Sequence, residues 1–286
     1  MSSGATRLAV LGQPIAHSKS PLLHAAAYAV LGLDWQYERV ELAGDELERF
    51  VRSRDYGWRG LSLTMPLKRD VLPVLDASDP LVTLTGAANT VLFEPGAADS
   101  DGRPTRTIRG FNTDVHGVTQ ALREAGLGEL RTVQLLGAGA TAASILVAVA
   151  EIGAREVAVL ARTAVNAAPL VALGESLGVA VTVHPLAALD GPAPDLVASA
   201  LPGSADHGVV FSEATRRRAV LFDVAYDPWP SSLAGAWLEV DGTVISGLEM
   251  LVHQALAQVR IFVTGSPVTA LPREADVLAA MRGAVA

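Results

Sequence analysis

Residues 133–142 read VQLLGAGATA and decide the fold expected for this chain. Val133, Leu135 and Leu136 form a short apolar run, two glycines follow at once, and a long apolar segment then reaches about Ile152. Such a succession predicts a short buried strand, a tight turn and a helix. We therefore expect a strand–turn–helix unit in an α/β protein with a parallel sheet.

The spacing of the glycines in this turn fits the dinucleotide-binding fingerprint GxGxxG/A. Gly137 permits the turn, Gly139 lets a pyrophosphate approach the backbone, and Ala142 lets the helix pack close to the strand. The phosphates would bind at the helix N-terminus, where free N–H groups and the helix dipole favour anions. Glycine-rich turns are also common in alanine-rich α/β chains, so the fingerprint alone does not identify a dinucleotide site and the neighbouring sequence has to be considered. The cofactor contacts expected in this turn are Gly137, Ala138, Gly139, Ala140 and Thr141.

A cation follows the second strand of this unit. EVAVLART at 156–163 reads as an apolar strand that ends in Arg162 and Thr163. Sites that bind NAD place an acidic residue about 20 residues after the glycines, where it binds the ribose 2′-hydroxyl. Arg162 at this position favours the 2′-phosphate of NADP, because a planar guanidinium suits a dianion. The alternative is an arginine that is simply exposed at the end of a strand.

Length and composition limit the class of protein. The chain has 286 residues, of which 50% are hydrophobic and 18% charged, so one large or two medium packed domains are expected, and we favour two. The absence of cysteine excludes disulfides, thiolate metal ligands and a cysteine nucleophile. A net charge of −8 argues against general nucleic-acid binding. The sequence shows neither an apolar run long enough to span a membrane nor a signal sequence, so we expect a soluble, cytoplasmic protein.

The first third of the chain places hydroxyl groups before a helix. An apolar strand at 8–11 leads into a loop that contains Ser18 and Ser20, and Pro21 suits the first helical turn. Ser20 is therefore the expected N-cap, and capping alone is the alternative to a role in binding. Ser18 is not explained by capping, and two hydroxyls beside a helix N-terminus would suit a small carboxylate. His17, like His24, has no partner at metal-ligand spacing, so no metal site is expected.

Polar residues also follow two further strands. In LSLTMPLK at 61–68, leucines alternate with polar residues, which predicts a half-buried strand that ends before Pro66. Thr64 and Lys68 would then lie at the carboxyl end of a strand, where open α/β sheets bind ligands. Asn89 in GAANTVLF precedes another strand. The alternatives are a solvated lysine and an ordinary turn asparagine.

Asp114 in GFNTDVHGV lies just ahead of a helical pattern. An acid that stabilises a helix N-terminus is the simple interpretation. If Asp114 meets Lys68 in space, however, the ion pair could hold, accept and donate a proton. Between these motifs, FEPGAADSDGRPT at 93–105 predicts an exposed hairpin loop.

Eight motifs in one order resemble the shikimate dehydrogenase family, over about residues 8–265: GQPIAHSKSP, LTMPLK, GAANT, GFNTD, GAGATA, ART, DVAYDPWPSSL and GLEMLVHQA. The resemblance implies an α/β substrate domain at 1–112 that is completed by C-terminal helices at 248–286. It also implies a Rossmann-type, doubly wound NADP domain at 113–247. The implied reaction is the reversible reduction of 3-dehydroshikimate to shikimate with NADPH.

The resemblance also implies roles for single residues. Ser18 and Ser20 would bind the substrate carboxylate, and Lys68 and Asp114 would be the catalytic pair. The other residues expected to contact the substrate are Thr64, Asn89, Asp114, Gln254 and Tyr226. Besides the glycine-rich turn, the residues expected to contact the cofactor are Arg162, Thr163, Val224 and Gly247.

Several positions depart from the family pattern. The family often has Asn where this chain has Ala25 and Ser62, which puts one substrate hydrogen bond in doubt. It commonly has Gly at the position of Ala140. The family segment NRT is ART here, with Ala161 in place of Asn, and the family segment NATP is SALP at 199–202. Cofactor contacts at these places are therefore less certain to be kept.

Two other functions fit part of this pattern. A quinate/shikimate dehydrogenase that uses NAD would share most of the residues, although Arg162 argues against it. A non-catalytic binding or regulatory protein on the same scaffold would be expected to lack Lys68 or Asp114, and both are present. We expect a small-molecule substrate and a monomer or homodimer.

Overall fold

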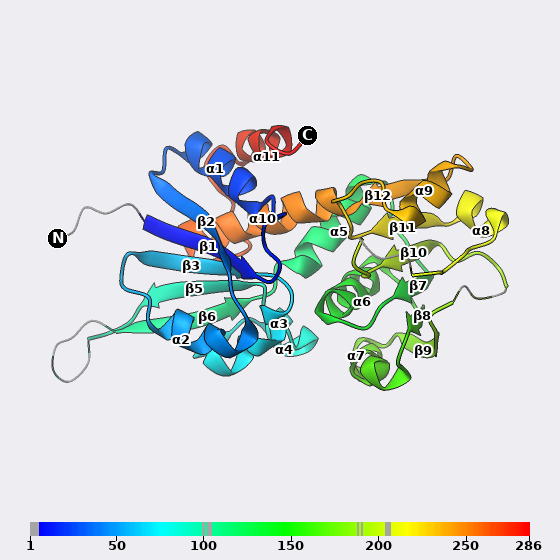
Figure 1. Ribbon diagram of the computed structural model, residues 1–286, viewed down its shortest axis with the longest axis horizontal. Helices are drawn as coiled ribbons and strands as arrows, with labels where there is room; N and C mark the ends of the chain where they lie inside the picture. Colours follow the sequence, from blue (N-terminus) through cyan, green and yellow to red (C-terminus); the bar gives the residue numbers. More distant parts are fainter. Residues whose placement is uncertain (1–5, 99–100, 102–104, 188, 190, 204–206) are drawn as a thin grey trace. The chain divides into compact units, whose positions relative to one another are not determined.

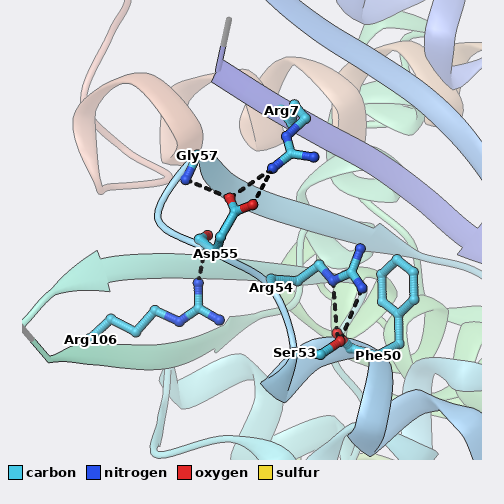
Figure 2. A network of polar contacts seen from close by, with 7 residues as sticks. All are labelled: Arg7, Phe50, Ser53, Arg54, Asp55, Gly57 and Arg106. Carbon is cyan, nitrogen blue, oxygen red and sulfur yellow. Dashed lines mark hydrogen bonds and ion pairs between the residues drawn. The ribbon is translucent and has the colours of Figure 1, made fainter. Parts of the chain in front are cut away.

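The chain forms two compact units in the computed structural model, which describes residues 6–98, 101, 105–187, 189, 191–203 and 207–286 (Figure 1). The first unit contains the chain up to Thr113 and again from Val252 to Ala286, and the second contains Asp114–Leu251. The first unit is therefore built from both ends of the chain. The second is one continuous stretch.

The first unit has a six-stranded sheet of mixed direction, in the order β2-β1-β3-β5-β6-β4. Strand β1 pairs in parallel with β2 and β3, whereas β5 runs antiparallel to both β3 and β6. The first residues of β5 therefore lie at the edge of the sheet where β1, β3 and β6 end. The strands are β1 (Thr6–Gly12), β2 (Trp35–Glu41), β3 (Trp58–Leu63), β4 (Ala77–Ser78), β5 (Thr90–Pro95) and β6 (Arg106–Phe111).

Helices cover both faces of this sheet (Figure 1). On one face, the leucines of β3 and Val91 and Phe93 of β5 pack with the apolar sides of α2, α3 and α4 in one buried core. On the other face, α10 lies against β3, and α1 packs with α11. The helices are α1 (Ser20–Leu31), η1 (Gly44–Glu46), α2 (Leu47–Arg52), α3 (Leu67–Asp70), η2 (Leu72–Val74), α4 (Pro80–Thr85), α10 (Gly247–Thr264) and α11 (Glu274–Gly283).

The prediction of a half-buried strand at 61–64 is wrong. Leu61 and Leu63 point into the core, as the alternation indicates, but Ser62 on the opposite face is only 3% exposed. It is covered because β3 is central and because Gln258 of α10 packs over it and accepts a hydrogen bond from its hydroxyl. The polar positions of this strand thus mark a second buried face rather than a solvated one.

The second unit is a doubly wound α/β fold, as the sequence predicts. All of its strands are parallel, in the order β12-β11-β10-β7-β8-β9. The order reverses between β7 and β10, and open α/β sheets bind ligands at such a switch point. The strands are β7 (Thr132–Leu136), β8 (Glu156–Ala161), β9 (Ala180–Pro185), β10 (Leu196–Ser199), β11 (Val220–Asp223) and β12 (Val244–Ser246).

Helix α6 is apolar on nearly every side, and most of it is buried. A helix of this composition is stable only when it is enclosed by protein, and here α5 and α7 pack beside it. It ends at Gly153, whose φ of 112° is a left-handed cap that suits glycine. The helices of this unit are α5 (Asp114–Glu124), α6 (Ala140–Ile152), η3 (Ala164–Ala167), α7 (Ala168–Leu177), α8 (Glu213–Arg218) and α9 (Ser232–Leu238).

The predicted hairpin at 93–105 joins β5 to β6. These strands pair from Thr90 opposite Phe111 to Pro95 opposite Arg106, and the described residues 96–98 and 101 are exposed. The rest of the loop lies outside the described residues. Among the helices that the structure describes, none has the length and apolar character needed to cross a bilayer.

We predict that Gly60→Ala lowers the free energy of unfolding by about 1–3 kcal/mol, the usual cost of overpacking a core. A Cβ at Gly60 would lie 2.5 Å from both the Phe262 ring and the Val91 carbonyl oxygen, so β3 and α10 would have to separate. Urea denaturation measures the change. Gly235→Ala on α9 is the control, since a Cβ there meets nothing within 4 Å and alanine favours a helix. Equal stabilities for the two variants would contradict this account.

Candidate active site

Three loops of the first unit meet at the edge where β1, β3 and β6 end. The Thr64 N–H donates to the Leu11 carbonyl at 2.9 Å, which joins the ends of β3 and β1. The Leu63 N–H donates to the Asn89 carbonyl at 2.8 Å, and the Asn89 N–H donates to the Phe111 carbonyl at 3.0 Å. Asn89 therefore sits between the ends of β3 and β6, with its backbone fixed on both sides.

The side chain of Asn89 is the centre of a buried polar cluster. Its Oδ1 accepts from the Thr113 N–H and the Thr90 hydroxyl, both at 2.9 Å. Its Nδ2 donates to the Thr113 hydroxyl at 2.8 Å and to Oε1 of Gln254 at 3.2 Å. Asn89 is only 2% exposed, so each of these bonds satisfies a group that would be costly to bury alone. Two predicted substrate residues, Asn89 and Gln254, are thus brought into direct contact.

Thr64 and Lys68 flank the same edge. Thr64 follows β3 and lies so close to Gly12 that a Cβ on the glycine would be 2.4 Å from the threonine methyl group. Lys68 is a half-buried residue in the short helix α3. Its carbonyl accepts from the Ala88 N–H at 2.8 Å, which ties this helix to the loop before Asn89. Both predicted residues therefore lie on segments that are joined to Asn89 by backbone hydrogen bonds.

The prediction that Ser20 caps helix α1 is wrong. The helix begins at Ser20 itself, and Lys19 is the N-cap residue with αR dihedrals and no capping side-chain bond. The hydroxyl of Ser18 instead accepts from the Ser20 N–H at 3.3 Å. Pro21 is therefore the second helical residue rather than the first, and its missing N–H is tolerated at either place because the first turn has no partners for these groups. Ser18 thus takes part of the capping role, and Ser20 is buried with 5% exposure.

Beneath this edge lies a cluster that the sequence analysis did not identify as functional. Gln258 follows Gln254 by one helical turn on α10, and its Nε2 donates to the Asn89 carbonyl and to the Thr90 hydroxyl. Its Oε1 contacts the Ser62 hydroxyl at 3.0 Å and Nε2 of His24 at 3.2 Å. The spacing of the two glutamines is the signal that was available, since residues four apart share a helix face.

His24 is completely buried in this cluster, as expected for a structural histidine. Its ring stacks on Tyr37 with centroids 3.9 Å apart, and Nδ1 lies 2.9 Å from the Tyr28 hydroxyl. Burial lowers the pKa of His24 from 6.5 to about 3, because the charged ring would be desolvated. Burial raises the pKa of Tyr28 and of Tyr37 for the same reason. All three rings are therefore neutral at physiological pH.

In the second unit, the glycine-rich turn has the conformation that the fingerprint predicts. Gly137 has a φ of 103°, which glycine adopts readily. Gly139 is the N-cap residue of α6, and a Cβ there would meet nothing within 4 Å. The helix therefore begins at Ala140. An exposed helix N-terminus beside open space is a place where backbone N–H groups can bind a phosphate.

Arg162 lies at the same edge of this sheet. It follows β8, the strand next to β7, and the Gly137 N–H donates to the Leu160 carbonyl at 2.9 Å. Arg162 and Thr163 are exposed, and Arg162 makes no hydrogen bond or ion pair with any residue that the structure describes. The guanidinium is thus a solvated cation beside the glycine-rich turn, which fits a 2′-phosphate and equally fits the simple alternative.

A buried carboxyl group shapes the loop after β11. Asp223 is 2% exposed, and its carboxyl accepts from the Ser231 hydroxyl at 2.5 Å and from the Ala225 N–H at 3.2 Å. Burial raises the pKa of this carboxyl. The next residue, Val224, approaches Gly247 so closely that a Cβ on Gly247 would lie 2.0 Å from the Val224 carbonyl oxygen. Asp223 therefore fixes a loop that holds the predicted cofactor residue Val224.

Two of the residues predicted to contact the substrate belong to the second unit. Asp114 is the first residue of α5 and is 3% exposed, and Tyr226 is half-buried in the loop after β11. Asp114 follows Thr113 directly in the chain, so its backbone starts at the Asn89 cluster. Its pairing with Lys68 of the first unit stays a prediction.

Comparisons with known proteins agree on one family. The sequence profile described as "Shikimate dehydrogenase substrate binding domain" matches residues 10–91. The shikimate dehydrogenase (NADP(+)) of Methanothermobacter thermautotrophicus is 30% identical over 277 residues, which cover 93% of this chain and 94% of the relative. The crystal structure of Mycobacterium tuberculosis shikimate dehydrogenase is similar with a TM-score of 0.80 at 37% identity, covering 97% of this chain and 99% of that one. Thermus thermophilus shikimate 5-dehydrogenase in complex with NADP(H) and shikimate is similar with a TM-score of 0.74 at 30% identity, with coverage of 97% and 99%.

The buried, neutral His24 makes stability depend on pH. Because its pKa is about 3 in the fold and 6.5 in the unfolded chain, the unfolded state binds more protons between these values, and stability falls as pH decreases through this window. Between pH 7 and pH 5 the loss is about 2 kcal/mol. We predict that His24→Gln removes this part of the pH dependence, measured by urea denaturation at both pH values. If wild type and His24→Gln lose the same stability between pH 7 and pH 5, the pKa of His24 is equal in the folded and unfolded states, which contradicts this account.

Proposed function

We propose that this chain, which belongs to the shikimate dehydrogenase family, catalyses the reversible reduction of 3-dehydroshikimate to shikimate with NADPH. The observation that carries the proposal is the edge of the first sheet, where Thr64, Lys68, Asn89 and Gln254 lie on segments joined by hydrogen bonds. A substrate with several hydroxyls and a carboxylate needs such a dense set of donors and acceptors. The Thermus relative has been solved in complex with both shikimate and NADP(H).

The first unit supplies the substrate site in this proposal, with boundaries at 1–112 and 248–286. Ser18 and Ser20, at the start of α1, would bind the carboxylate, since a helix N-terminus and two hydroxyls favour an anion. Thr64, Asn89 and Gln254 would bind the ring hydroxyls. The amide of Asn89 is oriented by four hydrogen bonds, which use both of its N–H donors and two acceptor positions of Oδ1. A substrate hydroxyl would therefore replace one of these partners.

Lys68 would act at the carbonyl oxygen. When bound, the cofactor supplies the hydride that is transferred to the carbonyl carbon. Lys68 stabilises the negative charge that develops on oxygen and donates a proton to it, and in reverse it takes the proton from the hydroxyl. Asp114 would orient the Lys68 ammonium group and accept a hydrogen bond from a neighbouring substrate hydroxyl. Tyr226 would lie beside the substrate.

The second unit supplies the cofactor site, with boundaries at 113–247. Gly137, Ala138, Gly139, Ala140 and Thr141 would surround the pyrophosphate, and the open space at Gly139 fits a phosphate on the backbone. Arg162 and Thr163 would bind the 2′-phosphate, and Val224 and Gly247 would contact the nicotinamide. We expect the reaction to take place in the cytoplasm and the enzyme to be a monomer or a homodimer.

An NAD-using quinate/shikimate dehydrogenase is the second candidate, because Ala161 supplies no amide beside Arg162. The deciding experiment is a steady-state assay of shikimate and of quinate, each with NADP and with NAD. The proposal requires turnover of shikimate with NADP to have the highest kcat/KM. A higher value for quinate with NAD supports the second candidate, and the absence of turnover with every pair supports a non-catalytic protein.

We predict that Lys68→Ala reduces kcat by about 10²- to 10⁴-fold, the usual contribution of a general acid–base group. The melting temperature should change little, since Lys68 is half-buried and packs no apolar core. Arg69→Ala is the matched control, because it removes an exposed cation from the same short helix and should retain wild-type kcat. A kcat for Lys68→Ala equal to that of the control would remove Lys68 from the mechanism.

We predict that Arg162→Asp weakens the use of NADP by about 10- to 150-fold, the equivalent of a charge-assisted hydrogen bond of about 1.5–3 kcal/mol. Use of NAD should fall less, because only NADP brings the phosphate that the new carboxylate repels. Arg155→Asp makes the same change of charge at the other end of β8 and is the control. The ratio of kcat/KM for NADP to that for NAD is the measurement. If the ratio stays at the wild-type value, the 2′-phosphate is bound elsewhere.

A further inference from the structure

A buried chain of side-chain hydrogen bonds connects helix α1 to the proposed substrate site. Every member belongs to the first unit and is at most 7% exposed. The successive contacts measure 2.9, 3.2, 3.1, 2.9 and 3.2 Å. In order, the chain runs through Tyr28, His24, Gln258, Thr90, Asn89 and Gln254.

Two backbone groups determine the direction of these bonds, because a carbonyl can only accept and an N–H can only donate. The Asn89 carbonyl faces the Gln258 amide, so the donating Nε2 of Gln258 must be on that side. Its Oε1 therefore faces Ser62 and His24. At the other end, the Thr113 N–H faces the Asn89 side chain, so Oδ1 of Asn89 must be on that side and Nδ2 must face Gln254.

The orientation of each remaining group then follows. Because Oε1 of Gln258 is an acceptor, Nε2 of His24 must carry the proton, and Nδ1 accepts from the Tyr28 hydroxyl. The Thr90 hydroxyl accepts from Gln258, so its own proton goes to Oδ1 of Asn89. Nδ2 of Asn89 donates to Oε1 of Gln254, so the Nε2 group of Gln254 points away from Asn89.

We propose that Gln258 and Thr90 are positioning residues. Together with the Thr113 N–H they hold Asn89 and Gln254 in one hydrogen-bond direction, so that Gln254 offers only donors to the substrate, and the tautomer of His24 reports this direction. This inference rests on the proposed function and adds to it which partner donates in the hydrogen bond between Gln254 and the substrate. The substrate hydroxyl beside Gln254 acts as an acceptor there, and its own proton goes to another partner. An oriented amide also needs no rearrangement when the substrate binds.

The tautomer of His24 tests the direction of the bonds without any assay of activity. Protein labelled with ¹⁵N-histidine is studied at pH 7 by long-range ¹H–¹⁵N correlation, and the His24 signals are assigned by their loss in His24→Gln. We expect the pattern of a neutral ring protonated at Nε2. A ring protonated at Nδ1, or at both nitrogens, would overturn the proposal, whether or not the enzyme reduces dehydroshikimate.

A pair of variants tests the positioning role. Thr90 and Ser62 each place one buried hydroxyl against Gln258, but only Thr90 also donates to Asn89. We expect Thr90→Val to raise the KM for shikimate by about 5- to 50-fold, while kcat and the KM for NADP change less than about threefold. Ser62→Ala should leave the KM for shikimate within about twofold of wild type.

Thermal melts of both variants separate positioning from loss of structure. A Thr90→Val protein that melts like Ser62→Ala but binds shikimate more weakly supports the proposal. Equal KM values for the two variants at equal melting temperatures overturn it. If Thr90→Val does not fold, Tyr28→Phe replaces it, and the proposal then requires the His24 tautomer to persist in that variant. If the proposed function itself is wrong, the wild-type protein shows no turnover of shikimate, which distinguishes that failure from failure of the positioning role.

Discussion

The backbone of Asn89 is the constraint on which the proposed substrate site depends. Its N–H and carbonyl are bonded to β6 and β3, so the residue occupies one position between two strand ends. Because β5 is antiparallel to its neighbours, the chain enters the sheet at the edge where the other strands leave it. Thr64, Thr113 and Gln254 are brought to this edge by the same arrangement. The position of the site is thus determined by the topology of the sheet rather than by any single side chain.

The first sheet has two cores of different chemistry. The face beneath α2, α3 and α4 is apolar and is held by burial of leucine and valine. The face beneath α10 contains Ser62, Thr90, Gln258 and His24, whose polar atoms are paired with one another. Apolar packing tolerates exchange of similar volumes, whereas a buried polar network is stable only when each donor meets an acceptor. The polar face therefore specifies one arrangement of α10 on the sheet.

The sequence was sufficient for the fold class and for the local conformations that depend on neighbouring residues. The glycine turn at Gly137 and the parallel strands of the second unit follow from periodicity and from the φ that glycine allows. Burial of Ser62 could not be predicted, because it depends on a helix almost 200 residues further along the chain. The start of α1 was misplaced by one residue because Pro21 fits the first and the second helical position equally, so it does not decide between Lys19 and Ser20 as the N-cap residue. Gln258 was missed because its partners come from three distant segments.

The discontinuous first unit has a consequence for synthesis of the chain. Residues 114–251 form a continuous unit, which can fold as soon as it has left the ribosome. The first unit lacks α10 and α11 until residues 247–283 are made, so α10 covers the polar face of the sheet only after residues 114–246 have been synthesised. The first unit can therefore be completed only after the second unit has been made, whereas N-terminal domains usually fold first.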